Sequence, residues 1–157
     1  MLKIIKATEN HLDSITALWK KLMDIHKEFD KDYFSETDNN IDYNHNNLEI
    51  SIKNDYERVF IAVMDEILVG YITAVKTKES NFGYNSIYVC TINDIMILPN
   101  FQDMGIGKAL IEEVKNWANS NNINQIELFV FSKNANALKF FKNQGFEDQF
   151  NKLELKF

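Results

Sequence analysis

A predicted strand, a short loop with two glycines and the start of a helix follow one another between residues 92 and 110. No other part of the chain constrains the fold as strongly. The strand candidate Ile87–Leu98 is the longest in the sequence and stops at Pro99, the only proline. A helical period begins at Ile106, directly after the loop. We therefore expect an α/β fold in which helices cover a sheet.

The rest of the chain extends this pattern to the order β-α-α-β-β-β-α-β-α-β, without repeats or linkers. The predicted strands are Leu2–Ala7, Val59–Met64, Ile67–Val75, Ile87–Leu98 and Gln125–Phe131, with one or two more within Phe146–Phe157. The predicted helices run from the N-cap Thr8 to Phe29, from about Leu48 to Asn54, from Ile106 to the run at 119–122, and from Ala135 to Asn143. Asp65 and Glu66 mark a hairpin turn, and residues 30–47 and 77–84 are predicted loops. A mixed sheet with helices on both faces follows.

Composition narrows the classes of function. The 157 residues, 45% of them hydrophobic, suit one folded domain over residues 1–157. A formal net charge of −6, with Arg58 the only arginine, leaves no basic stripe for nucleic acid. No apolar run approaches the roughly 20 residues that span a bilayer, and the single Cys90 suits the reducing cytoplasm, so we expect a cytoplasmic protein without a membrane partner. The three histidines lack metal-ligand spacing, which predicts no metal site, and a homodimer stays open.

The loop before the second long helix has the features of an anion site. Free N–H groups in the first turn of a helix, together with the helix dipole, suit a pyrophosphate, and Lys108 adds a positive charge. A P-loop needs a glycine at 102 and Ser or Thr at 109, where this chain has Gln102 and Ala109. A Rossmann fingerprint needs a small residue where Leu110 stands. The remaining interpretations are a Gln-x-x-Gly-x-Gly anion loop and a plain helix cap.

A second segment, Asn134–Phe146, lies one strand downstream and favours the first interpretation. Together the two segments resemble the GCN5-related N-acetyltransferase (GNAT) family. The matching positions are Gln102, Gly105 and Gly107 for its Q/R-x-x-G-x-G/A loop, Asn134, Ala137, Gly145 and Phe146 for its N-x-x-A…G-F segment, Gly70 for a third-strand glycine, and Asp94–Ile97 for its fourth strand. The resemblance spans nearly the whole chain, including the order of elements.

The resemblance implies a GNAT-like acyl-CoA N-acyltransferase fold, with a mostly antiparallel sheet splayed between its fourth and fifth strands. It also implies acetyl-CoA-dependent transfer of an acetyl group to a primary amine of a small molecule, protein or peptide, by direct attack in a ternary complex. In the family, fourth-strand main-chain groups pair with the pantetheine arm and the glycine loop holds the pyrophosphate. The residues implied at the acetyl-CoA site are Ile95, Met96, Ile97, Gln102, Asp103, Met104, Gly105, Ile106, Gly107, Lys108, Asn134 and Phe141.

One position departs from the family pattern. Members commonly carry a tyrosine four residues before the glycine of G-F, thought to protonate the departing thiolate, and this chain has Phe141. An alkylamine pKa near 10.4 lies about 3.4 units above neutrality, and a thiol pKa near 8.5 only about 1.5 units above it. Deprotonation of the amine is therefore the larger task, and we expect transfer to survive. Tyr84 and Tyr88 are candidates for a substitute acid.

The candidate bases are Asp94, on the strand beside the thioester, and His26, with Asp30 one helical turn away. Purely structural roles stay open for both, Asp94 in sheet pairing and His26 in packing. Since the first two helices line the acceptor cleft in the family, Phe29, Asp30 and Tyr33 are the candidate acceptor residues. Two other functions stay open: a CoA-binding sensor or interaction module without turnover, and an α/β domain whose glycines serve only as caps.

Overall fold

A five-stranded sheet with the order β1-β2-β3-β4-β5 forms the centre of the computed structural model, which describes residues 1–34, 40–79, 87–155 and 157. Antiparallel pairing joins β1 (Leu2–Lys6), β2 (Glu57–Met64), β3 (Ile67–Glu79) and β4 (Ile87–Ile97) in turn. The last strand, β5 (Ile126–Leu128), pairs in parallel with β4. The sheet is thus mixed and mostly antiparallel, as the family resemblance implies.

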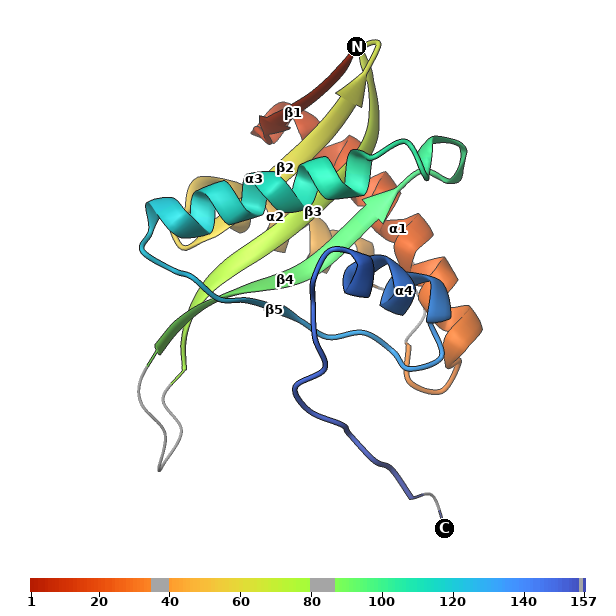
Figure 1. The fold of residues 1–157 in the computed structure, drawn as a ribbon. Helices are drawn as coiled ribbons and strands as arrows, with labels where there is room; N and C mark the ends of the chain where they lie inside the picture. The colour runs from red at the N-terminus through yellow and green to blue at the C-terminus, as the bar shows by residue number, and fades with distance from the viewer. Residues whose placement is uncertain (35–39, 80–86, 156) are drawn as a thin grey trace.

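Helices cover both faces of this sheet (Figure 1). On one face lie α1 (Leu12–Phe29), which follows the 3₁₀ turn η1 (Glu9–His11), and α2 (Ile41–Lys53). On the other face lie α3 (Ile106–Ser120), which follows the 3₁₀ turn η3 (Pro99–Phe101), and α4 (Ala135–Asn143). Each face has its own apolar core. The core under α1 and α2 includes Ile15, Leu22, Leu48, Tyr71 and Met96, and the core under α3 and α4 includes Ile72, Cys90, Ile92, Leu110 and Phe141.

Most predicted elements are confirmed, and local chemistry explains why they form. The β2–β3 hairpin turns at Asp65 and Glu66, whose φ angles of 49° and 69° match the right-handed twist of the flanking strands. The helices α3 and α4 begin at the predicted residues. Buried residues of α3 recur at steps of three and four, which is the pattern of a helix with one face against a sheet.

Four predicted boundaries are wrong. α2 begins at Ile41, seven residues before the predicted start. The prediction missed its first two turns because Leu48 is the only buried residue of the helix, so an apolar helical period is absent from its asparagine-rich sequence. β3 continues to Glu79, so part of the predicted loop 77–84 is strand, and the rest of that loop lies outside the described residues. β5 has only three residues instead of the predicted seven. Residues 146–155 are not in a strand, because they have no sheet partner.

Candidate functional site

The partner of β4 changes halfway along the strand. Cys90, Thr91 and Ile92 pair with β5 on one side and with β3 on the other. From Asp94 to Ile97, β4 pairs with β3 alone among the described residues. The predicted splay between the fourth and fifth strands is therefore confirmed, and the second half of β4 has an open main-chain edge.

A β-bulge lies where the splay begins. In the β3–β4 register, Ala74 faces Ile92 and Thr73 faces Asp94, so Asn93 is an additional residue on β4. Because side chains alternate between the faces of a strand, this residue moves Asp94 to the opposite face from Ile92. Ile92 belongs to the core under α3, and Met96, two residues after Asp94, belongs to the core under α1 and α2. The bulge therefore directs Asp94 toward the α1 and α2 face.

Asp94 combines partial burial with a perturbed pKa. Burial raises the pKa of Asp94 to about 6, and its backbone N–H donates to Thr73 Oγ1 at 3.1 Å. The nearby Tyr71 hydroxyl is buried without a hydrogen-bond partner among the described residues, and burial together with the charge of Asp94 raises the Tyr71 pKa. Sequence reasoning missed Tyr71 and Thr73, because both look like ordinary members of an apolar, β-branched strand. The arrangement gives Asp94 the properties of a base that works near neutral pH.

The loop between β4 and α3 is fixed at both ends. Gln102 Nε2 donates to the carbonyl of Ile97, the last residue of β4, at 3.3 Å. Asp103 and Gly105 have positive φ angles of 60° and 77°, and Gly105 is the N-cap of α3 without any capping side chain. The first helical hydrogen bond joins Ala109 N to Gly105 O at 3.0 Å, which leaves the N–H groups of residues 106–108 without helical acceptors. These groups and the helix dipole fit an anionic ligand.

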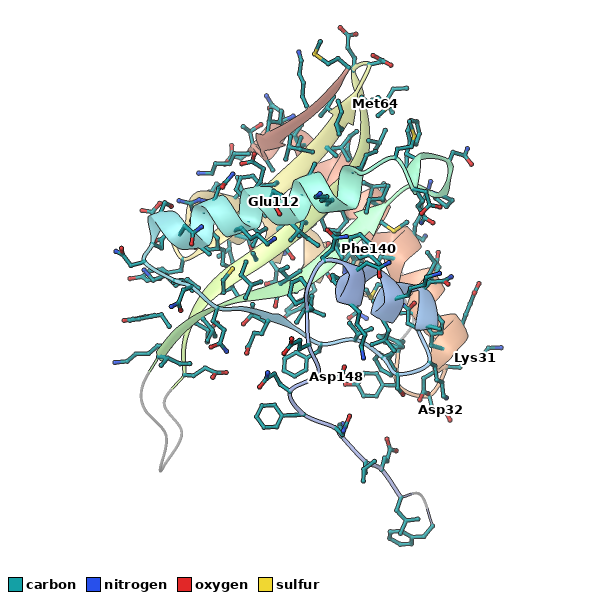
Figure 2. The ribbon with its side chains drawn as sticks, viewed as in Figure 1. Lys31, Asp32, Met64, Glu112, Phe140 and Asp148 are labelled. Carbon is teal, nitrogen blue, oxygen red and sulfur yellow. The ribbon has the colours of Figure 1, made fainter. Side chains whose placement is uncertain are left out.

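The second glycine of this loop has a packing role. A Cβ at Gly107 would lie 2.7 Å from Cζ of Phe140, so the ring of Phe140 on α4 (Figure 2) reaches the backbone of α3 at this point. The sequence predicts both glycines in an anion loop, and the structure adds a local role for each. Gly105 provides the left-handed turn, and Gly107 leaves room for the ring of Phe140.

Two residues of the second motif also have structural partners. Asn134 caps α4, since its Oδ1 accepts from Ala137 N at 3.1 Å, which explains the N-x-x-A spacing. Phe141 is only 7% exposed and packs against Phe140 and Phe146 at ring-centre distances of 5.1 and 5.6 Å. Phe141 therefore belongs to the core between α4 and the sheet, where a tyrosine would need a partner for its hydroxyl.

The predicted acceptor residues meet the β5–α4 connection at the end of α1. Tyr33, Phe34 and Phe131 form an aromatic cluster with ring-centre distances of 5.0 to 5.2 Å, and His26 stacks on Phe34 at 5.1 Å. We call these four residues the α1-end cluster. Burial lowers the pKa of His26, and its Nδ1 is buried without a hydrogen-bond partner among the described residues. Burial therefore favours the neutral form of His26.

The other two predicted acceptor residues contribute to the same junction. Asp30 Oδ1 accepts from the backbone N–H groups of Asp32 and Tyr33 at 3.1 Å each, which fixes the turn after α1. The carbonyl of Phe29 accepts from Lys133 Nζ at 3.2 Å and thereby ties α1 to the β5–α4 connection. Sequence reasoning missed Phe131, because it falls within a predicted strand and only the fold brings it to α1.

The structure does not bring Tyr88 to this site. Tyr88 pairs with Lys78 near the other end of β4, six residues from Asp94 and therefore about 20 Å along the strand. Its ring contacts Lys76 Nζ at 5.3 Å. Tyr84, the other candidate acid, lies outside the described residues. Cys90 is buried, and burial raises its pKa to about 11, which disfavours a reactive thiolate.

The described residues contain neither a metal-binding cluster nor a membrane-spanning helix. In the described ranges, no three His, Cys, Asp or Glu side chains gather in a way that could hold a metal ion. None of the helices described has the length and apolar character needed to cross a membrane.

The comparisons with known proteins agree with this geometry. The model of the acetyltransferase (GNAT) family matches residues 17–146. An uncharacterized N-acetyltransferase of Methanocaldococcus jannaschii is 27% identical over 146 residues, which cover 93% of this chain and 61% of that protein. An aminoglycoside N(6')-acetyltransferase of Salmonella typhimurium is 27% identical over 94 residues, which cover 60% of this chain and 65% of that protein. The match thus spans less than two thirds of the length of both relatives.

A solved structure shares the fold. The aminoglycoside N-acetyltransferase AAC(6')-Iy in complex with CoA superposes with a TM-score of 0.81 and 22% sequence identity, covering 99% of this chain and 94% of that chain. Since the family model also covers most of the chain, we conclude that this protein belongs to the acetyltransferase (GNAT) family.

Proposed function

We propose that this protein transfers an acetyl group from acetyl-CoA to a primary amine of a small molecule that carries several amino groups. One observation supports this most strongly. The open edge of β4 connects a base with a pKa of about 6, Asp94, to a helix N-terminus whose N–H groups are free. In the proposal, Asp94 serves the amine, the open edge of β4 holds the arm that carries the thioester, and the N-terminus of α3 binds the pyrophosphate.

The residues at the site fit acetyl-CoA, which would supply the acetyl thioester. The open main-chain edge at Ile95–Ile97 offers N–H and C=O groups to an extended, amide-containing chain. The free N–H groups of Ile106, Gly107 and Lys108 offer donors to its pyrophosphate. Gln102 holds the loop against the end of β4, which keeps these two groups of donors at a fixed separation. CoA in complex with the structurally similar AAC(6')-Iy supports this assignment.

Asp94 acts in the proposal as the base. Its carboxylate attracts the ammonium form of the acceptor and takes the proton that the nitrogen must lose before its lone pair can attack the carbonyl carbon. As the C–N bond forms, the C–S bond of the thioester breaks, and the CoA thiolate leaves and takes up the second proton of the nitrogen. With a pKa of about 6, Asp94 is mostly ionised at neutral pH and is still basic enough to take the proton. Thr73 fixes the main chain at Asp94 through the 3.1 Å hydrogen bond from the Asp94 N–H. Direct attack requires no covalent intermediate with the protein.

The acceptor class follows from charge and from the α1-end cluster. The chain carries a net charge of −6, which attracts polycations. The aromatic faces of Tyr33, Phe34 and Phe131 suit the apolar face of a sugar ring and attract ammonium groups. The Salmonella relative is named for aminoglycosides, which belong to this chemical class. We therefore propose aminosugars and polyamines as acceptors in preference to peptide amines. We also propose that the reaction takes place in the cytoplasm.

The test measures release of free thiol from acetyl-CoA. We expect release with an aminoglycoside or polyamine acceptor, and loss of release in the Asp94→Asn variant. Saturating CoA should raise the melting temperature by about 5–10 °C, the shift expected for a ligand at roughly 100 times its dissociation constant. No shift with either CoA form in folded protein would reject the proposal.

A second outcome distinguishes the alternative of a CoA-binding module without turnover. The observation behind that alternative is the buried ring of Phe141 at the position of the family tyrosine. A melting shift with CoA, without thiol release across aminoglycosides, polyamines, amino acids and peptides, would favour it. A Phe141→Tyr variant that gains transfer would give the same conclusion.

A further inference from the structure

A tyrosine hydroxyl lies within the apolar core under α1 and α2. Tyr71 on β3 is fully buried and belongs to the same core as Ile15, Ile61 and Met96. Its hydroxyl is buried and has no hydrogen-bond partner among the described residues. A buried donor without an acceptor destabilises the folded state, and a phenylalanine would avoid that cost. The hydroxyl therefore needs an explanation other than packing.

Asp94 is the acceptor that the strand register brings to this hydroxyl. Tyr71 faces Met96 across the β3–β4 pair, and Thr73 faces Asp94. Tyr71 and Asp94 are thus diagonal neighbours on the α1 and α2 face, a separation that aromatic side chains can span. Burial and the charge of Asp94 both raise the pKa of Tyr71, which agrees with this arrangement. The hydroxyl therefore keeps its proton at neutral pH and acts as a donor.

The other titratable groups near this face are not coupled to the pair. Burial alone raises the pKa of Asp94, so no charged group on β3, β4, α1 or α2 contributes to that shift within the described ranges. His26, half-buried at the end of α1, has its pKa lowered by burial alone. Glu127 on β5 accepts from Thr91 Oγ1 at 3.1 Å. Tyr71 is therefore the titratable group that Asp94 acts on.

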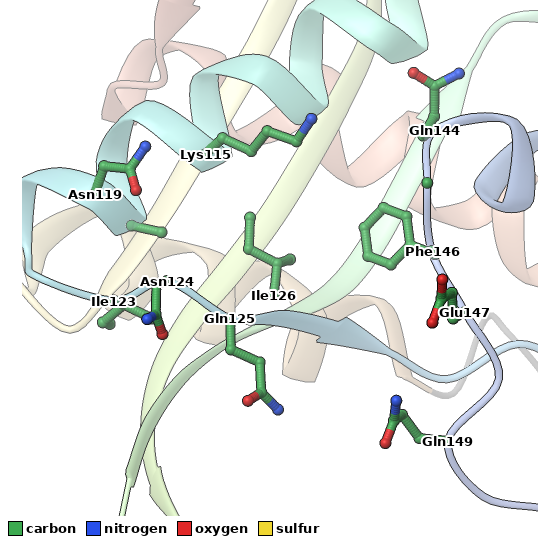
Figure 3. A pocket seen from close by; sticks show the side chains of 12 residues that line it. Lys115, Asn119, Ile123, Asn124, Gln125, Ile126, Gln144, Phe146, Glu147 and Gln149 are labelled. Carbon is green, nitrogen blue, oxygen red and sulfur yellow. The ribbon is translucent and has the colours of Figure 1, made fainter.

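The hollow between α3 and the segment after α4 lies on the opposite face of the sheet (Figure 3). Ile126 and Phe146 line this hollow and pack against the core under α3 and α4. Tyr71 belongs to the core on the other side of the sheet. A ligand in the hollow therefore cannot accept from the Tyr71 hydroxyl, and Asp94 is the acceptor within its reach.

We propose that Tyr71 is a positioning residue whose hydroxyl donates a hydrogen bond to the ionised carboxylate of Asp94 and holds it toward the acceptor amine. The two groups are not hydrogen-bonded in the structure, so the bond requires rotation of the Asp94 side chain. A buried carboxylate needs a donor far more than a neutral carboxyl does, so ionisation favours that rotation. This inference rests on the proposed function, because it takes Asp94 as the base.

The experiment follows the ionisation of Asp94 by carbon NMR of its carboxyl group, with neither acetyl-CoA nor an acceptor present. We expect Tyr71→Phe to raise the Asp94 midpoint by about one pH unit or more, because the charged form loses a donor. The rising limb of kcat/KM against pH should move upward by the same amount. A purely structural hydroxyl would change stability alone, so an unmoved or lowered midpoint would overturn the proposal.

Thr16→Val is the matched control. Thr16 Oγ1 on α1 is another buried hydroxyl without a partner among the described residues, and its loss should leave the Asp94 midpoint unchanged. Equal shifts in both variants would overturn the proposal. If Tyr71→Phe fails to fold, replacement of Tyr71 by 3-fluorotyrosine decides, since ring fluorine makes the hydroxyl a stronger donor and the midpoint must then fall.

The two proposals fail in different measurements. A raised Asp94 midpoint in Tyr71→Phe, without thiol release from any acceptor in the unchanged chain, would support the contact between Tyr71 and Asp94 and reject the proposed function. Thiol release with an unmoved midpoint would support the proposed function and reject the role of Tyr71.

Discussion

Both halves of β4 pair with β3, but they differ in their second neighbour and in the regularity of their pairing. Ile87–Ile92 forms part of a regular sheet, and its last three residues have partners on both sides. Asn93–Ile97 begins with a bulge, has an open edge and contains Asp94, whose pKa is raised to about 6. The comparison teaches that pairing ends where the proposed chemistry begins, so stability and activity should respond to different halves of one strand.

Asp94→Asn tests the open half and should have the largest effect. We expect kcat/KM for acetyl transfer to fall by about 10²- to 10⁴-fold, because the general base is lost. The rise of kcat/KM with an apparent pKa of about 6 should disappear from the pH profile. The matched control is Glu127→Gln on β5, whose carboxylate accepts from Thr91 Oγ1 at 3.1 Å beside the paired half. Equal losses in both variants would remove the distinction between the halves.

The same substitution should stabilise the protein at high pH. The folded-state pKa of Asp94, about 6, lies above its ordinary value of 3.8, so the favourable contribution is present below pH 3.8 and is lost as the pH rises through 6. The difference of about 2.2 units corresponds to at most about 3 kcal/mol. The unfolding free energy of Asp94→Asn relative to the unchanged chain should increase from pH 5 to pH 8. Urea titrations at the two pH values measure it, and a constant difference would contradict the raised pKa.

Gly70→Ala tests how tightly the open half is held by β3. Gly70 pairs with Ile97, and a Cβ there would lie 2.8 Å from the carbonyl oxygen of Met96, so the two strands must separate. We expect a loss of roughly 2 kcal/mol, which lowers Tm by about 4–8 °C, with a higher KM for acetyl-CoA. Gly107→Ala serves as the comparison, because its Cβ would meet the side chain of Phe140 instead of backbone. The Gly70 variant should be the less stable of the two in thermal unfolding.

Cys90→Ala tests the paired half and should have the smallest effect. Cys90 is fully buried between β3, β5 and α3, and its removal leaves a small cavity worth about 1 kcal/mol. Because the thiol pKa of about 11 keeps it protonated and it faces the core, kcat/KM should stay within about twofold. Chemical denaturation and thiol-release rates measure the two quantities. A large loss of activity at unchanged stability would assign the thiol a role that its position does not predict.

Much of the fold could be predicted because its signals are local. Runs of β-branched and apolar residues indicated the strands β2 to β4, Asp65 and Glu66 the hairpin, and the period after Ile106 the helix α3. The boundaries that failed depend on contacts distant in sequence. α2 buries little surface of its own, and β5 is short because β4 turns away from it at Asn93.

The candidate site was only partly predictable. Asp94 and the glycine loop could be identified from residue type and motif spacing. The contact of Gly107 with Phe140 required the fold, since it joins α3 to α4 through packing. The cap formed by Asn134 and the hydrogen bond from Gln102 to Ile97 are local, at separations of three and five residues, and the predictions did not include them. Tyr88 shares a strand with Asp94, but the six residues between them correspond to about 20 Å along the strand, which separates Tyr88 from the site.

The additional residue at Asn93 also affects how chains of this kind should be aligned. Successive side chains of a strand point to opposite faces of the sheet, so one inserted residue reverses the face of every position after it. If a relative lacks this residue and is aligned without a gap, the residue matched to Asp94 faces the layer of α3 instead of the layer of α1 and α2. An alignment gap at Asn93 is therefore the place to look when deciding which relatives have an acidic residue on the α1 and α2 face.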